Sequence, residues 1–298
     1  MMRRWASVDC RLLALTCLKR LYTRCCSSDA RTASFGFREV GEEDKARLVG
    51  DVFSSVAPSY DLMNDLMSVG LHRLWKDRLV AKLQPFAGMH HMDVAGGTGD
   101  VAFRVLRDMA ADAARDPTSD AGAAPAQDGA GEWRAGGVTV CDINPAMLEE
   151  GRRRAASGGH EAGLRWVVGD AEQLPLPARS VDGYTIAFGI RNVTRIDAAL
   201  AEAFRVLKPG GQFLCLEFSQ LVLPGLRELY DAYSFNVIPQ IGRVVARDEA
   251  SYQYLVESIR RFPPQDDFAE QVRCAGFAGV AYENLSGGVC AIHSGFKL

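Results

Sequence analysis

The chain has 298 residues, of which 48% are hydrophobic and 24% charged, an ordinary composition for a globular protein of one large or two small domains. No apolar run reaches the roughly 18 residues that a membrane-spanning helix needs. The net charge is +5 over residues 1–35 and −8 over the remainder, which argues against a nucleic-acid-binding surface and therefore against a nucleic-acid partner.

Residues 1–35 differ in composition from the rest of the chain. They are rich in arginine, contain Ser and Thr, and hold only two acids, Asp9 and Asp29. This composition is typical of a mitochondrial transit peptide, although Asp9 is unusual in one. A secretory signal is the alternative, through the apolar residues 12–18, but Lys19 and Arg20 end that run early. An uncleaved, disordered tail is the third alternative.

Beyond the leader, residues 42–298 are expected to form one domain in which helical and strand patterns alternate. Strands alternating with helices predict an α/β fold with a doubly wound, mostly parallel sheet. A terminal hairpin makes seven strands, the last of them antiparallel. In chain order we expect a helical region at 42–85, a strand at 89–94, a helix at 99–111, a strand at 138–143, a helix at 145–156, strands at 164–168 and 181–188, a helix at 196–207 closed by 209–211, a strand at 212–218, a helical region at 224–262, a helix at 265–275, and hairpin strands at 280–285 and 289–296.

Residues 112–137 interrupt this alternation. They are rich in Ala, Gly, Asp and Pro and almost lack large apolar side chains, so we expect a low-complexity, disordered surface insertion. A functional loop is the alternative.

The cysteines and histidines give no metal-binding pattern. Cys141, Cys215, Cys274 and Cys290 stand alone, mostly in apolar segments, and are expected to be small buried core residues. The adjacent pair His90 and His91 is interpreted as incidental. No metal is therefore expected.

The segment 92–100, Met-Asp-Val-Ala-Gly-Gly-Thr-Gly-Asp, predicts a strand, a tight glycine turn and a helix. Free N–H groups at the start of such a helix suit a nucleotide-like ligand. Residues 97–102 also fit the dinucleotide pattern G-x-G-x-x-A, so a nicotinamide cofactor is one alternative. Asp93, four residues before Gly97, instead resembles the acid of the first motif in class I S-adenosylmethionine (SAM) methyltransferases. A turn that merely packs a helix on a strand is the remaining interpretation.

Acids at the next two strand ends favour SAM. Asp142 can accept both ribose hydroxyls, and it lies 43 residues after Gly99, or 17 when the 26-residue insertion is left out. Asp170, followed by Ala171, can accept the adenine amino group. Carboxyl ends of parallel strands meet at one edge of a sheet, so Asp93, Gly97, Gly99, Asp142 and Asp170 are expected to surround one cofactor.

Longer motifs make the resemblance more specific. The segments Ala187-Phe188-Gly189-Ile190-Arg191-Asn192-Val193 and Ser251-Tyr252-Gln253-Tyr254-Leu255 resemble the ubiquinone/menaquinone-biosynthesis C-methyltransferase family. Further matching segments lie at 53–61, 63–68, 70–76, 205–211, 216–219, 256–259, 282–285 and 293–297. The resemblance covers residues 53–298 apart from the insertion. It implies a Rossmann-like SAM-dependent methyltransferase fold with helical lid elements, and SAM contacts at Thr98, Asp142, Asp170 and Ala171.

The resemblance also implies a reaction. Together with the leader, it predicts methylation of a ring carbon of 2-methoxy-6-polyprenyl-1,4-benzoquinol in ubiquinone synthesis, on the matrix side of the mitochondrial inner membrane. Peripheral membrane association, a complex with other ubiquinone-biosynthesis enzymes and a homodimer are expected with it. The alternatives are methylation of demethylmenaquinol and a catalytically silent SAM-binding scaffold.

Carbon methylation needs an electron-rich ring, so a cation that favours the quinol oxyanion is the expected catalytic group. Arg191, just after the fourth strand, is the candidate, directly or through a water, and Asn192 is expected to orient the quinol oxygen. Arginine is a poor proton acceptor, so a water or Asp142 is left for that step. Tyr60 and Asp61 are expected to close over the cofactor or to cap a helix, and residues 62–69 and 230–241 to form a lid or ordinary packing.

Overall fold

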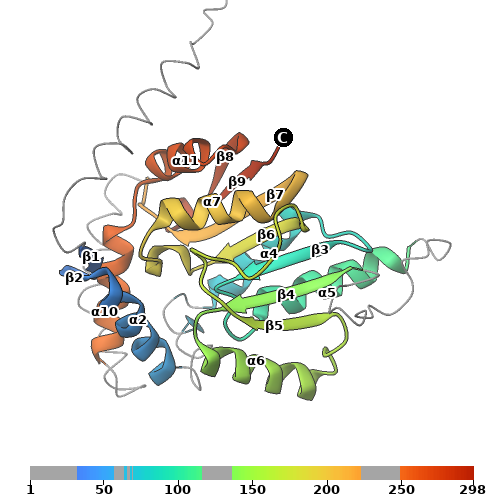
Figure 1. Cartoon of the computed structure of the whole chain (residues 1–298), viewed down its shortest axis with the longest axis horizontal. Helices are drawn as coiled ribbons and strands as arrows, with labels where there is room; N and C mark the ends of the chain where they lie inside the picture. The colour runs from blue at the N-terminus through green and yellow to red at the C-terminus, as the bar shows by residue number, and fades with distance from the viewer. Residues whose placement is uncertain (1–31, 57–63, 66–67, 69, 116–135, 223–248) are drawn as a thin grey trace, which may run out of the picture.

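A computed structural model describes residues 32–56, 64–65, 68, 70–115, 136–222 and 249–298. Its centre is a seven-stranded sheet in the order β5-β4-β3-β6-β7-β9-β8 (Figure 1). The strands are β3 (His90–Val94), β4 (Gly137–Asp142), β5 (Leu164–Val168), β6 (Val181–Ala187), β7 (Leu207–Phe218), β8 (Ala278–Leu285) and β9 (Cys290–Phe296).

The sheet has the predicted parallel core and terminal hairpin. Strands β5, β4, β3, β6 and β7 pair in parallel, whereas β9 pairs antiparallel with both β7 and β8. The last strand of the chain therefore lies between β7 and β8. The predicted fold class, including the antiparallel last strand, is confirmed.

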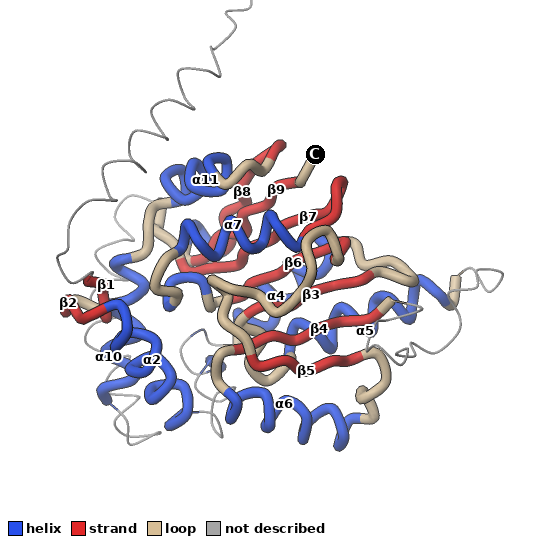
Figure 2. Tube along the Cα trace, in the orientation of Figure 1, coloured by secondary structure: helices blue, strands red, loops and turns tan. Residues whose placement is uncertain are grey.

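Helices cover both faces of the sheet (Figure 2). On one face α4 (Leu71–Leu83), α5 (Asp100–Ala113) and α6 (Pro145–Gly158) enclose a core with residues of β4, β7 and β9. On the other, α7 (Ile196–Val206) and α11 (Gln265–Cys274) enclose a second core. Burial of apolar stripes on helices against a sheet buried on both faces is the main source of stability in such a fold.

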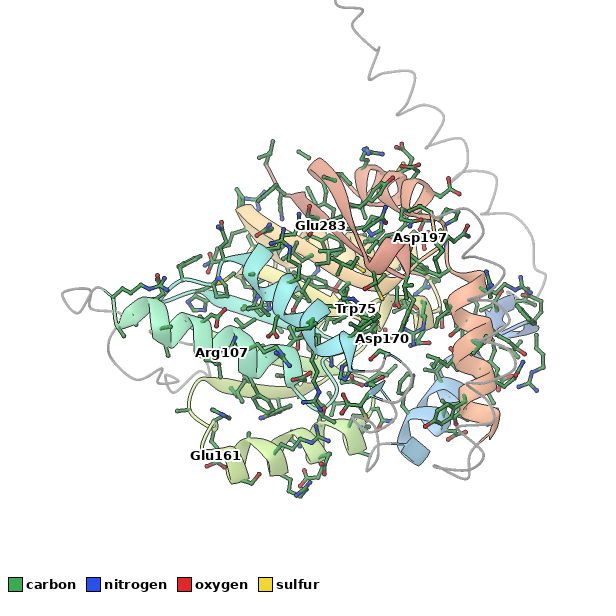
Figure 3. All side chains as sticks on the ribbon, turned by 180° about the vertical axis from the view of Figure 1, so that it is seen from behind. Trp75, Arg107, Glu161, Asp170, Asp197 and Glu283 are labelled. Carbon is green, nitrogen blue, oxygen red and sulfur yellow. The ribbon has the colours of Figure 1, made fainter. Side chains whose placement is uncertain are left out.

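Trp75 of α4 lies near the middle of the first core (Figure 3). Its ring packs against Phe188 and Phe218, with ring centroids 6.3 and 6.2 Å away. Its indole N–H donates to Ser286 Oγ at 3.0 Å, which satisfies the polar end of a buried ring. This packing fixes α4 against the end of the sheet where β6 and β7 finish.

A smaller cluster lies beside the main domain (Figure 1). It consists of β1 (Thr32–Phe35), β2 (Arg38–Gly41), α2 (Glu42–Val56) and α10 (Glu249–Arg261). Phe35 of β1 stacks on Tyr254 of α10 with ring centroids 4.3 Å apart, and both rings pack near Val49 of α2. Ala33 and Phe35, which fall within the predicted 1–35 leader, are buried in this cluster. Periodicity missed this hairpin because each strand has only four residues.

Several element boundaries differ from the expectation. The strand predicted at 212–218 begins at Leu207, and 209–211 lie within β7 rather than closing a helix. Gly210, with φ of +82°, allows the chain to bulge there, and the pairing jumps from Val181↔Leu207 to Gly183↔Gln212. Of the predicted insertion 112–137, residues 112–113 belong to α5 and residue 137 to β4. Residues 116–135 lie outside the described part of the chain.

Three other sequence expectations concern side chains and segments. Cys141, Cys215 and Cys290 are buried as predicted, but Cys274 at the end of α11 is exposed, because it faces away from the core that Val272 enters. Most of the proposed lid, 62–69 and 230–241, lies outside the described residues, as do Tyr60 and Asp61. Among the described helices, none combines the length and hydropathy that a membrane crossing requires.

Candidate active site

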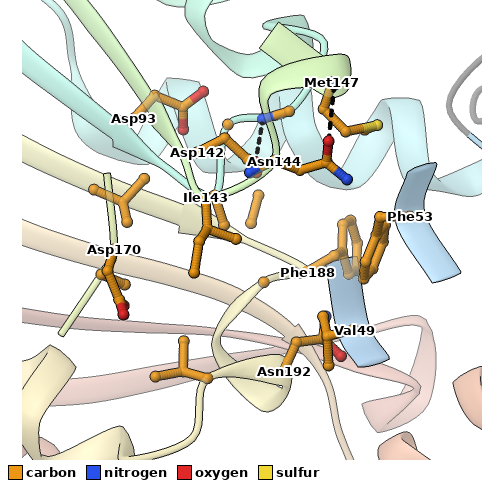
Figure 4. Close-up of a pocket in the computed structure, with 18 of the residues that line it drawn as sticks. Val49, Phe53, Asp93, Asp142, Ile143, Asn144, Met147, Asp170, Phe188 and Asn192 are labelled. Atoms are coloured by element: carbon orange, nitrogen blue, oxygen red, sulfur yellow. Dashed lines mark hydrogen bonds between the residues drawn. The ribbon is translucent and has the colours of Figure 1, made fainter. Parts of the chain in front are cut away.

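A cavity opens at the carboxyl ends of β3, β4, β5 and β6, between the sheet and α2 (Figure 4). Its volume is about 1100 Å³, including the part open to solvent. Asp93, Asp142 and Asp170, from three successive strand ends, lie around it, as the sequence predicts. In open α/β sheets this edge is where ligands bind.

The glycine turn forms the floor of the cavity. Gly97 and Gly99 have φ of +52° and +84°, and Gly99 is the N-cap residue immediately before α5. A Cβ on Gly96 would lie 2.7 Å from Val140 and 2.9 Å from Asp93 Oδ2, so no larger residue fits there. Gly99 does not line the cavity; a Cβ on it would meet Trp166 at 2.6 Å, so its role is close packing. The turn thus brings backbone atoms against any ligand in the cavity.

Asp142 organises the turn beside it. Its Oδ2 accepts the Gly97 N–H at 2.9 Å and its Oδ1 accepts the Asn144 N–H at 2.8 Å. Burial raises the pKa of this carboxyl to about 6, although these N–H donors favour the ionised form. Each carboxylate oxygen still has acceptor capacity on the cavity side, which suits a diol such as a ribose.

The wall beyond Asp142 is suited to a flat ring. Ile143, Met147 and Ala171 contribute apolar surface, and Asp170 lies at the exposed rim. Asp170 Oδ1 accepts the N–H of Glu172 at 2.9 Å, which fixes the direction of the carboxylate. An apolar slot ending in an acceptor fits adenine with its exocyclic amine.

Asp93 is the most deeply buried acid of the cavity. Its Oδ1 accepts the Thr185 hydroxyl at 2.8 Å, whereas its Oδ2 is buried and has no hydrogen-bond partner among the described residues. Burial raises its pKa to about 7. A buried carboxylate oxygen with no donor is costly, which indicates that a ligand supplies one.

Lys76, which the sequence interpretation missed, reaches the same cavity from α4. Its ammonium lies 2.7 Å from Asp100 Oδ2, and its side chain is only 7% exposed. Burial opposes ionisation of Asp100, but Lys76 and Arg104 outweigh it and hold its pKa below the usual range. The cavity is therefore lined by a carboxyl group on β3, Asp93, and by an amine on α4, Lys76.

Helix α2 closes the cavity on the side away from the sheet. Val49, Gly50 and Phe53 face into it, and all three were absent from the sequence prediction. Asn144 Nδ2 donates to Gly50 O at 3.2 Å and to Ser54 Oγ at 3.0 Å. These hydrogen bonds connect α2 to the N-cap residue of α6.

A third tie joins α2 to the segment after β6. Lys45 Nζ donates to Val193 O at 2.9 Å. The lysine is buried, and burial lowers its pKa despite the nearby carboxylates of Glu172 and Glu39. The wall of the cavity is therefore anchored at both the β4 side and the β6 side.

The two predicted catalytic residues take different positions. Asn192 lines the cavity, and its Oδ1 accepts the Tyr254 hydroxyl at 2.9 Å. Arg191 is 8% exposed and does not line the cavity. Its Nη1 lies 2.8 Å from Glu217 Oε1 and donates to Phe188 O at 2.5 Å. The guanidinium is therefore paired behind the wall rather than directed into the cavity.

Seven of the nine predicted site residues are thus brought together by the fold: Asp93, Gly97, Thr98, Asp142, Asp170, Ala171 and Asn192. The two outside, Gly99 and Arg191, support the wall. Among the described residues there is no group of three or more His, Cys, Asp or Glu side chains that could hold a metal ion.

The apolar slot that ends at Asp170 and the carboxylate of Asp142 suit the adenine and the ribose of SAM. The amino-acid end of SAM carries an ammonium and a carboxylate, which suit Asp93, with its unpartnered oxygen, and Lys76. The strand order and this site define a SAM-dependent methyltransferase of the Rossmann-like class. Solved structures share the fold: a SAM-dependent methyltransferase from Thermotoga maritima has a TM-score of 0.55 at 18% identity, covering 83% of this chain and 99% of that one. The methyltransferase in a Haloferax volcanii complex with the Trm112 activator has a TM-score of 0.53 at 17% identity, covering 82% and 96%.

The chain belongs to the ubiE/COQ5 methyltransferase family, whose model matches residues 38–297. Curated relatives named "2-methoxy-6-polyprenyl-1,4-benzoquinol methylase, mitochondrial" are similar over most of their length. The Oryza sativa subsp. japonica protein is 59% identical, with 90% of each chain covered. The Arabidopsis thaliana protein is 57% identical, covering 91% of this chain and 92% of that one. The Homo sapiens protein is 52% identical, covering 93% and 89%.

Proposed function

We propose that this protein transfers a methyl group from SAM to a ring carbon of 2-methoxy-6-polyprenyl-1,4-benzoquinol, a step of ubiquinone synthesis. Identity of 52–59% to relatives of that name, over nine-tenths of the chain or more, carries the proposal. The intact cavity with its three acids supports an active enzyme over a silent scaffold.

Each part of SAM has a proposed partner in the cavity. Asp142 accepts the ribose hydroxyls, and Asp170 with Ala171 takes the adenine. Thr98 and the backbone of Gly97, with Gly99 supporting the turn, approach the methionyl part. Asp93 pairs with the ammonium and Lys76 with the carboxylate of that amino-acid end.

The reaction requires the protein chiefly to orient the quinol and SAM and to stabilise negative charge on the quinol oxygen. SAM supplies, when bound, a methyl group already activated on a positively charged sulfur. A free phenol ionises near pH 10, so the site must favour a partly ionised quinol at lower pH. Asn192, whose amide Tyr254 fixes, is the proposed partner of the quinol oxygen. Alignment of ring carbon, methyl and sulfur is the remaining contribution of the cavity wall.

Arg191 has a revised role in this proposal. Its pairing with Glu217 and its bond to the Phe188 carbonyl support a positioning residue that fixes the Gly189–Asn192 segment. Contact between the guanidinium and the quinol oxygen, directly or through a water, as the position of Arg191 after the fourth strand predicts, is the competing proposal.

We further propose peripheral association with the matrix side of the mitochondrial inner membrane, assembly with other enzymes of the pathway, and a homodimer. The basic leader and the isoprenoid tail of the substrate support the membrane location. Subcellular fractionation tests it: the protein should sediment with mitochondrial membranes and be released by salt or carbonate.

The reaction is tested with purified protein, labelled SAM and short-tailed quinols kept reduced. Label should enter the 2-methoxy-benzoquinol faster than the demethylmenaquinol analogue, and loss of the protein in cells should accumulate the demethylated benzoquinol intermediate. Preference for the naphthoquinol would transfer the assignment to menaquinone synthesis. SAM binding without transfer to either quinol, also with pathway enzymes added, would support the scaffold.

The role of Lys76 gives a separate prediction. Lys76→Met removes the cation proposed for the SAM carboxylate, so affinity for SAM should fall by about ten- to a hundredfold, the value of a charge-assisted hydrogen bond. Affinity for 5′-methylthioadenosine, which lacks the amino-acid end, should change less than about twofold, because it cannot make this bond. Lys82→Met on the same helix is the matched control, since Lys82 pairs with Glu283 outside the cavity. Calorimetry that shows equal losses for both ligands would contradict the assignment.

A further inference from the structure

Three buried polar side chains form a chain beneath the glycine turn. His91 Nε2 lies 2.9 Å from Thr185 Oγ1, and the Thr185 hydroxyl donates to Asp93 Oδ1 at 2.8 Å. His91 and Asp93 belong to β3 and Thr185 to β6, which pairs with β3. All three side chains are at most 1% exposed, so no bulk water competes for these bonds.

When Asp93 is ionised, the hydrogen-bonding capacity of these groups assigns a direction of donation. Thr185 has one hydroxyl hydrogen, which it donates to Asp93, so it accepts from His91 Nε2–H. Burial lowers the pKa of His91 to about 3, so the ring is neutral and carries one hydrogen, at Nε2. The sequence interpretation of His91 as incidental missed this contact, because pairing across two strands is not visible from spacing.

The hydrogen bonds among these three side chains leave one oxygen of Asp93 for a ligand. Oδ1 accepts the hydrogen bond from Thr185, whereas the buried Oδ2 has no hydrogen-bond partner among the described residues. Asp93 itself lines the cavity. The charged or titratable groups facing Asp93, apart from His91, are Lys76 of α4, Asp100 of α5, Cys141 and Asp142 of β4, and Tyr184 of β6. A donor on Oδ1 stabilises the ionised carboxylate without adding a charge.

We propose that Thr185, supported by His91, is a positioning residue that keeps Asp93 ionised and directs its Oδ2 at the ammonium of the SAM amino-acid end. This inference rests on the proposed SAM-binding function. It makes cofactor affinity dependent on pH through a residue that never touches the cofactor. Burial raises the pKa of Asp93 and the Thr185 hydrogen bond lowers it, so loss of that bond moves the pKa upward.

The test is calorimetric titration of the full chain with S-adenosylhomocysteine from pH 6 to pH 9, for wild type, Thr185→Val and Thr185→Ser. With a pKa of about 7 at Asp93, wild-type affinity should fall about tenfold from pH 8 to pH 6. Thr185→Val should shift this dependence upward by about one pH unit, weakening binding about fivefold at pH 7 and less than about twofold at pH 9. Thr185→Ser keeps the hydroxyl and should follow wild type. Comparing proteins with one ligand cancels the titration of the ligand itself.

Two further measurements separate positioning from general structural damage. Asp93→Asn, which cannot ionise, should bind S-adenosylhomocysteine weakly and remove the wild-type pH dependence above pH 7, where Asp142 is ionised in both proteins. Affinity of Thr185→Val for 5′-methylthioadenosine should match wild type at every pH, because this ligand has no ammonium. Thr139→Val, at a buried threonine of β4 outside the cavity wall, is the matched control and should leave all titrations unchanged.

A uniform, pH-independent loss in Thr185→Val, or an equal loss of 5′-methylthioadenosine binding, would overturn the inference while leaving SAM binding intact. If Thr185→Val does not fold, Thr185→Ala removes the same donor without crowding and must show the same shift. Absence of S-adenosylhomocysteine binding in the wild type would overturn the proposed function as well.

Discussion

Replacing Asp142 with alanine is expected to weaken SAM binding by at least about 100-fold, because two charge-assisted bonds to ribose hydroxyls are worth about 1.5–3 kcal/mol each. The same substitution removes the acceptor for the N–H groups of Gly97 and Asn144, so the turn and the start of α6 also lose a contact. Calorimetry with SAM and thermal unfolding measure the two effects separately.

The pH dependence adds to this prediction. Burial raises the pKa of Asp142 to about 6, so the carboxylate is ionised above that pH and takes up a proton as the pH falls through it. SAM affinity in the wild type should therefore fall further below pH 6, in addition to the loss that protonation of Asp93 causes above that pH. Asp142→Asn keeps one oxygen acceptor but no charge and should lie between wild type and alanine, without this dependence.

Asp182 offers a matched control for Asp142. Its Oδ2 accepts the His90 N–H at 2.9 Å and its Oδ1 pairs with Lys208, at the opposite end of β6 from the cavity. Asp182→Ala should lower the unfolding temperature and leave SAM affinity unchanged. Unaltered SAM binding in Asp142→Ala would contradict the ribose assignment.

The part of the site at the sheet edge could be predicted from the sequence because local pattern and topology suffice there. An apolar run, a glycine turn and a helical period identify one strand end, and parallel strands place Asp142 and Asp170 at the same edge. Removing the insertion from the spacing between Gly99 and Asp142 was enough to restore the expected geometry.

The rest of the site depends on helix placement that spacing does not encode. Lys76, Val49 and Phe53 come from helices that precede the sheet in the chain, and nothing local in sequence shows which face of α2 or α4 turns to the cavity. Arg191 is the opposite case, a residue that the sequence places in the site and the structure places behind its wall. Its position after a strand predicts exposure to the ligand, but a buried acid on the neighbouring strand, Glu217, pairs with it.

The Arg191–Glu217 pair gives the largest expected effect on stability. Its side chains are 4% and 1% exposed, and burial raises the pKa of Glu217 even though Arg191 opposes that rise. Glu217→Gln leaves the arginine cation buried without its counter-charge, which should cost about 3–5 kcal/mol of unfolding free energy. Denaturant unfolding with S-adenosylhomocysteine absent measures this loss.

A double-mutant cycle separates a positioning role of Arg191 from a catalytic one. Arg191→Met alone should be as destabilising as Glu217→Gln, because it leaves a buried carboxylate unpaired, whereas the double variant should recover most of the loss. If Arg191 acts by holding the segment that carries Asn192, turnover should recover with stability, to within about tenfold of wild type. A stable double variant that binds S-adenosylhomocysteine normally but stays about a thousandfold slow would instead assign the guanidinium to the transition state. The cycle is informative because the single variants alone reduce turnover under either role.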